Sequence, residues 1–99
     1  MIQSLKKLIW NLENRREMYL IGNDYDSICT FLVGYSLGYR EAANVDVAKA
    51  FQEWLQVKEK KHFSLHWSAY ILNHMADNDK KKAQRILFKL LNRFIENAK

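Results

Sequence analysis

The stretch from Asp79 to Lys99, DKKKAQRILFKLLNRFIENAK, has a regular helical pattern that sets the fold class. Its apolar side chains recur at intervals of three and four residues, so they share one face of an α-helix. These inward-facing residues are Ala83, Ile86, Leu87, Leu90, Leu91, Phe94 and Ile95. Basic residues occupy the other face, and the segment from Asp77 to Asp79 is suited to cap the start of the helix. The stretch therefore predicts an amphipathic helix that buries one face in a larger core.

The same spacing predicts two further amphipathic helices. One covers about residues 3–14, and its apolar stripe consists of Ile2, Leu5, Leu8, Ile9 and Leu12. The other covers about residues 45–60, and its stripe consists of Val47, Ala50, Phe51, Trp54 and Leu55. Asn44 or Asp46 can cap this helix, because a short side-chain oxygen there accepts a hydrogen bond from a backbone N–H of the first turn.

The segment of about residues 26–42, DSICTFLVGYSLGYREA, is apolar nearly all round. A helix with this pattern is expected to be the central and most buried one, with Asn23, Asp24 or Asp26 as its N-cap. Gly34 and Gly38 lie four residues apart and share a face of this helix. We expect them to allow close packing against a neighbouring helix.

A remaining helix is predicted in SLHWSAYILNHM, where Ser64 opens the segment. Two buried faces are compatible with its pattern. One consists of Leu65, Ser68, Leu72 and Met75, and the other of Trp67 and Ile71.

The composition agrees with a helical domain. The chain has no proline and three glycines in 99 residues, and 48% of its residues are hydrophobic, which is enough for one core. We therefore predict an all-α fold, a compact single-domain bundle of about five helices over residues 1–99. The single cysteine, Cys29, excludes an intramolecular disulfide. Neither a signal peptide nor a run of roughly 18 apolar residues is present, so we expect a cytoplasmic protein with no membrane contact.

Residues with catalytic spacing are lacking. The sequence contains no nucleophile elbow, no phosphate-binding glycine loop and no His-Glu-x-x-His motif. His62, His66 and His74 would suit a metal only on one continuous helix, but Ser64 interrupts it and no acidic or cysteine ligand accompanies them. We therefore predict that the protein is not an enzyme and has no catalytic residue, cofactor or bound metal.

The net charge of +5 is distributed unevenly. Residues 1–16 carry +3, residues 17–48 carry −4 and residues 49–99 carry +6. An acidic middle block does not suit a protein that simply coats phosphate, whereas it suits one that docks on a basic partner.

Several short motifs follow one another along nearly the whole chain. They are Arg-x-x-Met-Tyr-Leu (Arg15, Met18, Tyr19, Leu20), Phe-Leu-x-Gly-Tyr (Phe31, Leu32, Gly34, Tyr35), Phe-x-x-Trp-Leu (Phe51, Trp54, Leu55), Trp-Ser (Trp67, Ser68) and Leu-Leu-x-x-Phe (Leu90, Leu91, Phe94). This order resembles a family of small all-helical bacterial immunity proteins, found beside polymorphic and contact-dependent growth-inhibition toxins. In the usual form of the first motif, Pro and Gly stand where this chain has Arg16 and Glu17.

The resemblance implies both an architecture and a function. Met18, Tyr19 and Leu20 would pack under the second helix before a turn at Gly22. The protein would bind the C-terminal domain of a cognate toxin, one to one, and occlude its active or substrate-binding site without turnover. Such toxins are commonly nucleases, so a nuclease is the expected partner.

Two surfaces are candidates for that contact. Because nuclease clefts are basic, the acidic middle block is the first, with partner-binding residues Asp24, Tyr25, Asp26, Tyr39, Glu41 and Asp46. A toxin with an acidic surface would instead meet the basic face formed by Lys80, Lys81, Lys82 and Arg85. Two other functions remain open: a small basic helical nucleic-acid-binding protein, and a homo-oligomer built on exposed aromatics among Trp10, Trp54 and Trp67.

Overall fold

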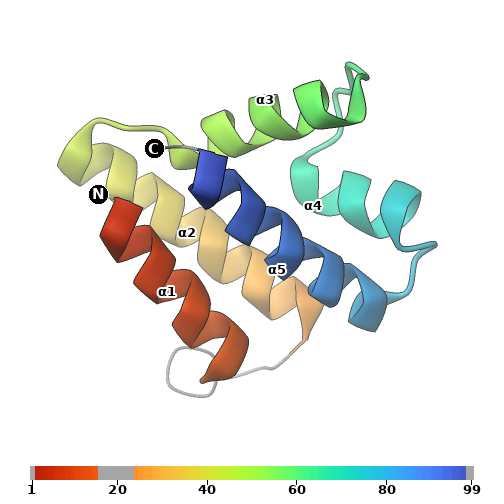
Figure 1. Cartoon of the computed structure of the whole chain (residues 1–99), viewed down its shortest axis with the longest axis horizontal. Coiled ribbons are helices and arrows are strands. Elements are labelled where there is room, and N and C mark those ends of the chain that lie inside the picture. The colour runs from red at the N-terminus through yellow and green to blue at the C-terminus, as the bar shows by residue number, and fades with distance from the viewer. Residues whose placement is uncertain (1, 16–23, 98–99) are drawn as a thin grey trace.

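The computed structural model describes residues 2–15 and 24–97, and of residues 2–4 it describes the backbone alone. Its elements are α1 (Ile2–Asn14), α2 (Tyr25–Ala43), α3 (Val47–Glu59), α4 (Trp67–Tyr70), the π-helical segment η2 (Ile71–Met75) and α5 (Lys80–Asn97) (Figure 1). The predicted all-α bundle of about five helices is confirmed. The predicted packing role of Met18, Tyr19 and Leu20 and the turn at Gly22 lie outside the described residues, as does Asn23.

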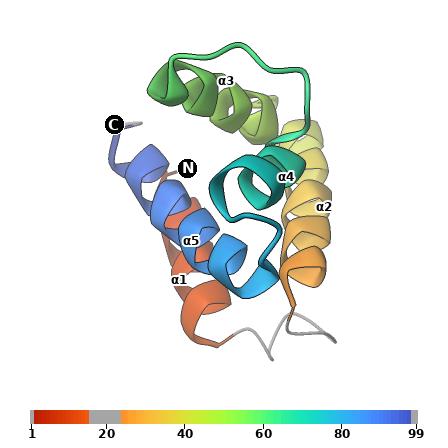
Figure 2. The ribbon, with the colours of Figure 1, turned by 90° about the vertical axis from the view of Figure 1, so that its right-hand side faces the viewer.

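Helix α5 lies at the centre of the bundle. It packs against α1, α2, α3 and η2, and Figure 2 shows it next to α1. Its buried residues are Ala83, Leu87, Phe88, Leu90, Leu91 and Ile95, while Ile86 and Phe94 are partly buried. The predicted apolar stripe of this helix is therefore confirmed, and Phe88 widens it.

The prediction that the second helix is the most buried one is wrong. Helix α2 buries Tyr25, Ile28, Cys29 and Leu32, all in its first half. In its second half Leu37 is 56% exposed. The reason is visible in Figure 1, where the C-terminal end of α2 projects past α1 and α5 and has α3 as its neighbour.

The expected close packing at Gly34 and Gly38 is also wrong. A Cβ atom added at either position would meet nothing within 4 Å, and both glycines are exposed. They lie in the second half of α2, on a face that no helix of the described residues approaches within 4 Å of an added Cβ.

Aspartate side chains cap three of the helices. Asp24 Oδ1 accepts the N–H of Ser27 at 2.8 Å at the start of α2, and Asp46 Oδ1 accepts the N–H of Lys49 at 3.0 Å at the start of α3. Asp79 Oδ1 likewise accepts the N–H groups of Lys81 and Lys82 at the start of α5. Each bond satisfies a donor that has no partner inside the helix.

The fourth helix begins at Trp67, three residues after the predicted start at Ser64. Its buried face consists of Trp67, Tyr70 and Ile71, so the second of the two predicted faces is the observed one. Leu65 lies outside the helix and is 40% exposed. Among the described segments, no helix is both long enough and apolar enough to cross a membrane.

A candidate partner-binding groove

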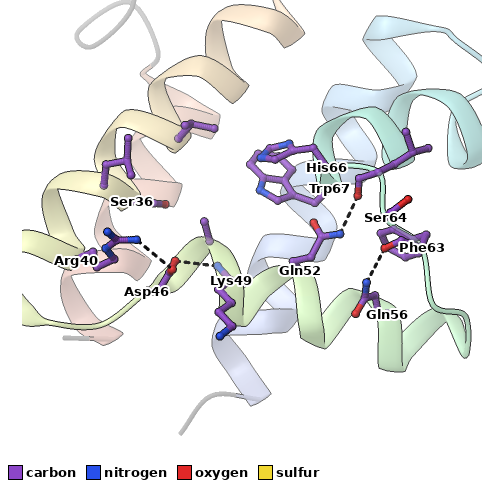
Figure 3. A pocket seen from close by; sticks show the side chains of 14 residues that line it. Ser36, Arg40, Asp46, Lys49, Gln52, Gln56, Phe63, Ser64, His66 and Trp67 are labelled. Carbon is purple, nitrogen blue, oxygen red and sulfur yellow. Dashed lines mark hydrogen bonds and ion pairs between the residues drawn. The ribbon is translucent and has the colours of Figure 1, made fainter.

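An open groove of about 560 Å³ lies between the second half of α2, helix α3 and the segment that leads into α4 (Figure 3). Its apolar lining consists of Val33, Leu37, Ala48, Phe63, Leu65 and Trp67. Its polar lining consists of Ser36, Arg40, Asp46, Lys49, Gln52, Gln56, Ser64 and His66. Two of the large apolar side chains left exposed in the described structure, Leu37 and Leu65, belong to this lining.

Two glutamines of α3 hold in place the segment before α4, which forms the wall of the groove opposite α2. Gln52 Nε2 donates to the carbonyl of Leu65 at 2.8 Å, and Gln56 Nε2 donates to the carbonyl of Phe63 at 2.7 Å (Figure 3). The ring of Phe63 stacks on Tyr70 with a centroid distance of 3.8 Å. These contacts hold the segment before α4 away from α2, because its backbone groups bond to side chains of α3 instead of continuing the helix. The groove is therefore a defined feature of the fold.

The charges in the groove leave a positive excess. Among the described residues that line it, Arg40 and Lys49 stand against a single carboxylate, that of Asp46. Asp46 Oδ1 is already engaged in capping α3, and Oδ2 lies 3.8 Å from Arg40 Nη1. This ion pair is long and its side chains are 54% and 38% exposed, so it holds Arg40 only weakly.

Trp67, which lines the groove, carries an unsatisfied donor. Its Nε1 atom is buried and has no hydrogen-bond partner among the described residues. The same side chain also lines a small apolar cavity of about 40 Å³, whose walls include Leu32, Phe51 and Leu91. Figure 3 shows Ser36 facing the rings of His66 and Trp67 across the hollow. An unpaired buried N–H is costly, so an acceptor that reached it would be favoured.

His66 combines a structural role with its place in the groove. Its Nδ1 atom accepts the N–H of Ser68 at 3.2 Å and so caps α4, and the hydroxyl of Ser68 lies 2.7 Å from the same nitrogen. Partial burial lowers the pKa of His66 below its usual value of 6.5. The imidazole in the groove is therefore predominantly neutral at pH 7.

The predicted acidic surface does not form one patch. Asp24 and Asp26 lie at the start of α2, whereas Tyr39 and Glu41 lie near its end, so about 20 Å of helix separates them. Only Asp46 belongs to the groove. A single toxin cleft would have to cover most of the length of α2 to meet all of them.

Tyr25 is not available as a partner-facing anchor, and this prediction is wrong for the structure as it stands. Its side chain is 2% exposed, and its hydroxyl donates to the carbonyl of Ser68 at 2.6 Å. Tyr39 is half-buried and lies beside Tyr35, with a ring-centroid distance of 5.9 Å. It keeps part of its ring accessible.

The predicted basic face carries less free charge than its sequence indicates. Lys80 Nζ lies 2.7 Å from Asp26 Oδ2, and Lys82 Nζ lies 3.7 Å from Asp77 Oδ2. Lys81 and Arg85 are exposed on the same helix. Two of the four predicted basic contacts are therefore already paired with acidic groups.

The three tryptophans differ in exposure. Trp10 is 53% exposed, Trp54 is partly buried and Trp67 is 4% exposed. Only Trp10 offers most of its ring to another chain. No group of three His, Cys, Asp or Glu residues within the described ranges could hold a metal ion.

Most of the groove was not anticipated from the sequence. Ser36, Leu37 and Arg40 lie on α2, whereas Leu65 lies in the segment before α4, and no local motif joins them. One indication was present, however: a helix that is apolar nearly all round but not fully buried must present apolar side chains to solvent or to a partner.

Comparisons with known proteins give no match: no protein-family model matches the sequence, no curated protein is significantly similar to it, and no solved structure is significantly similar to its fold.

Proposed function

We propose that the protein is an immunity protein, which binds the toxic domain of a cognate toxin in the cytoplasm and blocks it by stoichiometric occlusion. A nuclease is the toxin class that the sequence resemblance suggests. One toxin domain would bind one copy of this chain, and no chemical turnover would be needed.

One observation carries this proposal on the structural side: the open groove exposes Leu37 and Leu65 beside charged groups. Exposed apolar side chains with a polar rim are typical of protein–protein interaction sites. A specific interface buries roughly 800 Å² on each partner, so the groove would form the centre of a larger contact. The all-α bundle is also the architecture that the resemblance implies.

The decisive experiment combines rescue of growth with complex formation. The toxic domain encoded immediately upstream would be expressed with and without this protein, and the two proteins would be co-purified. Rescue together with a one-to-one complex that withstands 0.5 M salt supports the proposal. Growth arrest despite stable expression of this protein, with no complex, overturns it.

A second candidate function, nucleic-acid binding, is favoured by one feature. Lys81, Arg85, Lys89 and Arg93 are exposed along α5. Four phosphate contacts would make the affinity for bulk DNA fall about a hundredfold between 50 and 200 mM salt. A titration of DNA at these two salt concentrations separates this function from toxin binding.

A further inference from the structure

We infer that the groove accepts an acidic, otherwise apolar segment of the toxin, with a carboxylate placed against Arg40 and apolar side chains placed on Leu37 and Leu65. This inference rests on the proposed function and names the contact surface within it. It differs from both surfaces indicated by the sequence, because Asp46 is the one residue of those surfaces that lines the groove as the structure describes it.

Charge complementarity indicates that the occupant of the groove carries a negative charge. Arg40 and Lys49 line the groove, and Asp46, whose carboxylate is the one that the described lining contains, uses Oδ1 to cap α3. The distance of 3.8 Å from Arg40 Nη1 to Asp46 Oδ2 leaves the other donors of the guanidinium available to a second carboxylate. The positive charges of Arg40 and Lys49 would repel a basic segment, whereas the excess of positive charge in the groove would attract an acidic one.

The apolar part of the occupant follows from the exposed side chains. Leu37 is 56% exposed and Leu65 is 40% exposed, and both border the same hollow. Covering them removes apolar surface from water, and Phe63 and the edge of Trp67 extend this surface. A purely polar ligand would leave this surface in contact with water.

Trp67 supplies a reporter of occupancy. Its side chain lines the groove, and its buried Nε1–H has no partner among the described residues. The NMR resonance of this indole N–H responds to a change in its surroundings, so it can report an occupant of the groove.

The first arm of the test measures the Kd of the toxin domain for variants of the full chain. Arg40→Gln and Leu37→Ser are expected to raise the Kd about tenfold each. Lys7→Gln removes one positive charge at an exposed position on α1, and Val57→Ser removes an apolar side chain that is 77% exposed outside the groove. Both controls should leave the Kd within about twofold.

The outcomes distinguish failure of the inference from failure of the proposed function. If the complex forms but both groove variants bind as the original chain does, the groove is not the contact surface and the inference is overturned. A lack of any complex overturns the proposed function. The second arm of the test then decides whether the groove binds an acidic, apolar segment.

The second arm needs no toxin. A Leu/Glu peptide of about twelve residues and a matched Leu/Gln peptide are titrated into the ¹⁵N-labelled protein. The Leu/Glu peptide should shift the indole resonance of Trp67, and the shift should be lost in Arg40→Gln. Equal shifts with both peptides, or no shift, overturn the assignment of an acidic occupant.

Discussion

Lys80 Nζ lies 2.7 Å from Asp26 Oδ2, although 54 residues separate the two in the sequence. The contact ties the first turn of α5 to the first turn of α2. It also joins a residue of the predicted acidic surface to one of the predicted basic face, so the two surfaces partly neutralise each other where they meet. The pair raises the pKa of Lys80, through the hydrogen bond to Asp26 and the charge of that carboxylate.

A double-mutant cycle with Asp26→Asn and Lys80→Gln should give a small favourable coupling. The side chains of Lys80 and Asp26 are 55% and 63% exposed, so water and salt screen the attraction. Thermal unfolding of the four proteins at low salt measures the coupling, and 0.5 M NaCl should reduce it. A coupling that does not change with salt would contradict a simple exposed ion pair.

Replacement of Gly34 and Gly38 by alanine should stabilise the protein. Both positions are helical and exposed, an added Cβ meets nothing within 4 Å, and neither backbone has a positive φ. Alanine lowers the entropy of the unfolded chain, so each change should add about 0.5–1 kcal/mol to the free energy of unfolding. Chemical denaturation of the double variant tests this. Destabilisation would mean that something covers this face of α2.

The helices could be predicted from the sequence because each has a local cause. The apolar stripe that includes Ala83, Leu87 and Leu91 predicted helix α5, and the capping residue Asp46 indicated where α3 begins. The extent to which α2 is buried could not be predicted from its sequence, because burial depends on which other helices pack against it. Its apolar pattern is the same whether a side chain is buried, as Leu32 is, or exposed, as Leu37 is.

The groove could not be predicted for a related reason. Its wall depends on hydrogen bonds from Gln52 and Gln56 to backbone carbonyls 13 and 7 residues away. Glutamine in a helix normally faces water, so neither residue stands out in the sequence. The same bonds explain why the fourth helix starts at Trp67 and not at Ser64.

The change Tyr25→Phe should destabilise the protein by about 1 kcal/mol, the usual net value of one hydrogen bond. The hydroxyl of Tyr25 donates to the carbonyl of Ser68 at 2.6 Å and links α2 to α4. The cost stays moderate because that carbonyl also accepts the N–H of Ile71. Urea unfolding measures the loss, which corresponds to a fall in Tm of about 4–8 °C. Weaker toxin binding without any loss of stability would instead place Tyr25 at the interface.

Cys29 should react slowly in the folded protein. Burial raises the pKa of its thiol from 9.0 to about 12, so the thiolate is about a thousandfold scarcer at pH 8 than in the unfolded chain. Ellman's reagent should therefore label the native protein slowly and the urea-unfolded protein at once. Because the raised pKa favours the neutral thiol in the folded state, its contribution to stability is complete below pH 9 and is lost as the pH rises towards 12. A Cys29→Ala variant serves as the control for this loss.

The capping role of His66 predicts a loss of stability in mild acid. Burial lowers the pKa of His66 below 6.5 in the folded state, and its unprotonated Nδ1 accepts the N–H of Ser68. The unfolded chain therefore binds a proton more readily, so the contribution of His66 is complete above pH 6.5 and is lost as the pH falls through the lower folded pKa. The variant His66→Asn keeps an acceptor suited to an N-cap but does not titrate.

Thermal unfolding between pH 7 and 5 measures the effect. The Tm of the original chain should fall more steeply than that of His66→Asn. Equal slopes would show that protonation of His66 does not disturb the start of α4. In that case, protonation would simply add a positive charge to the groove that Arg40 also lines, and mild acid should tighten binding of the Leu/Glu peptide and not of the Leu/Gln peptide.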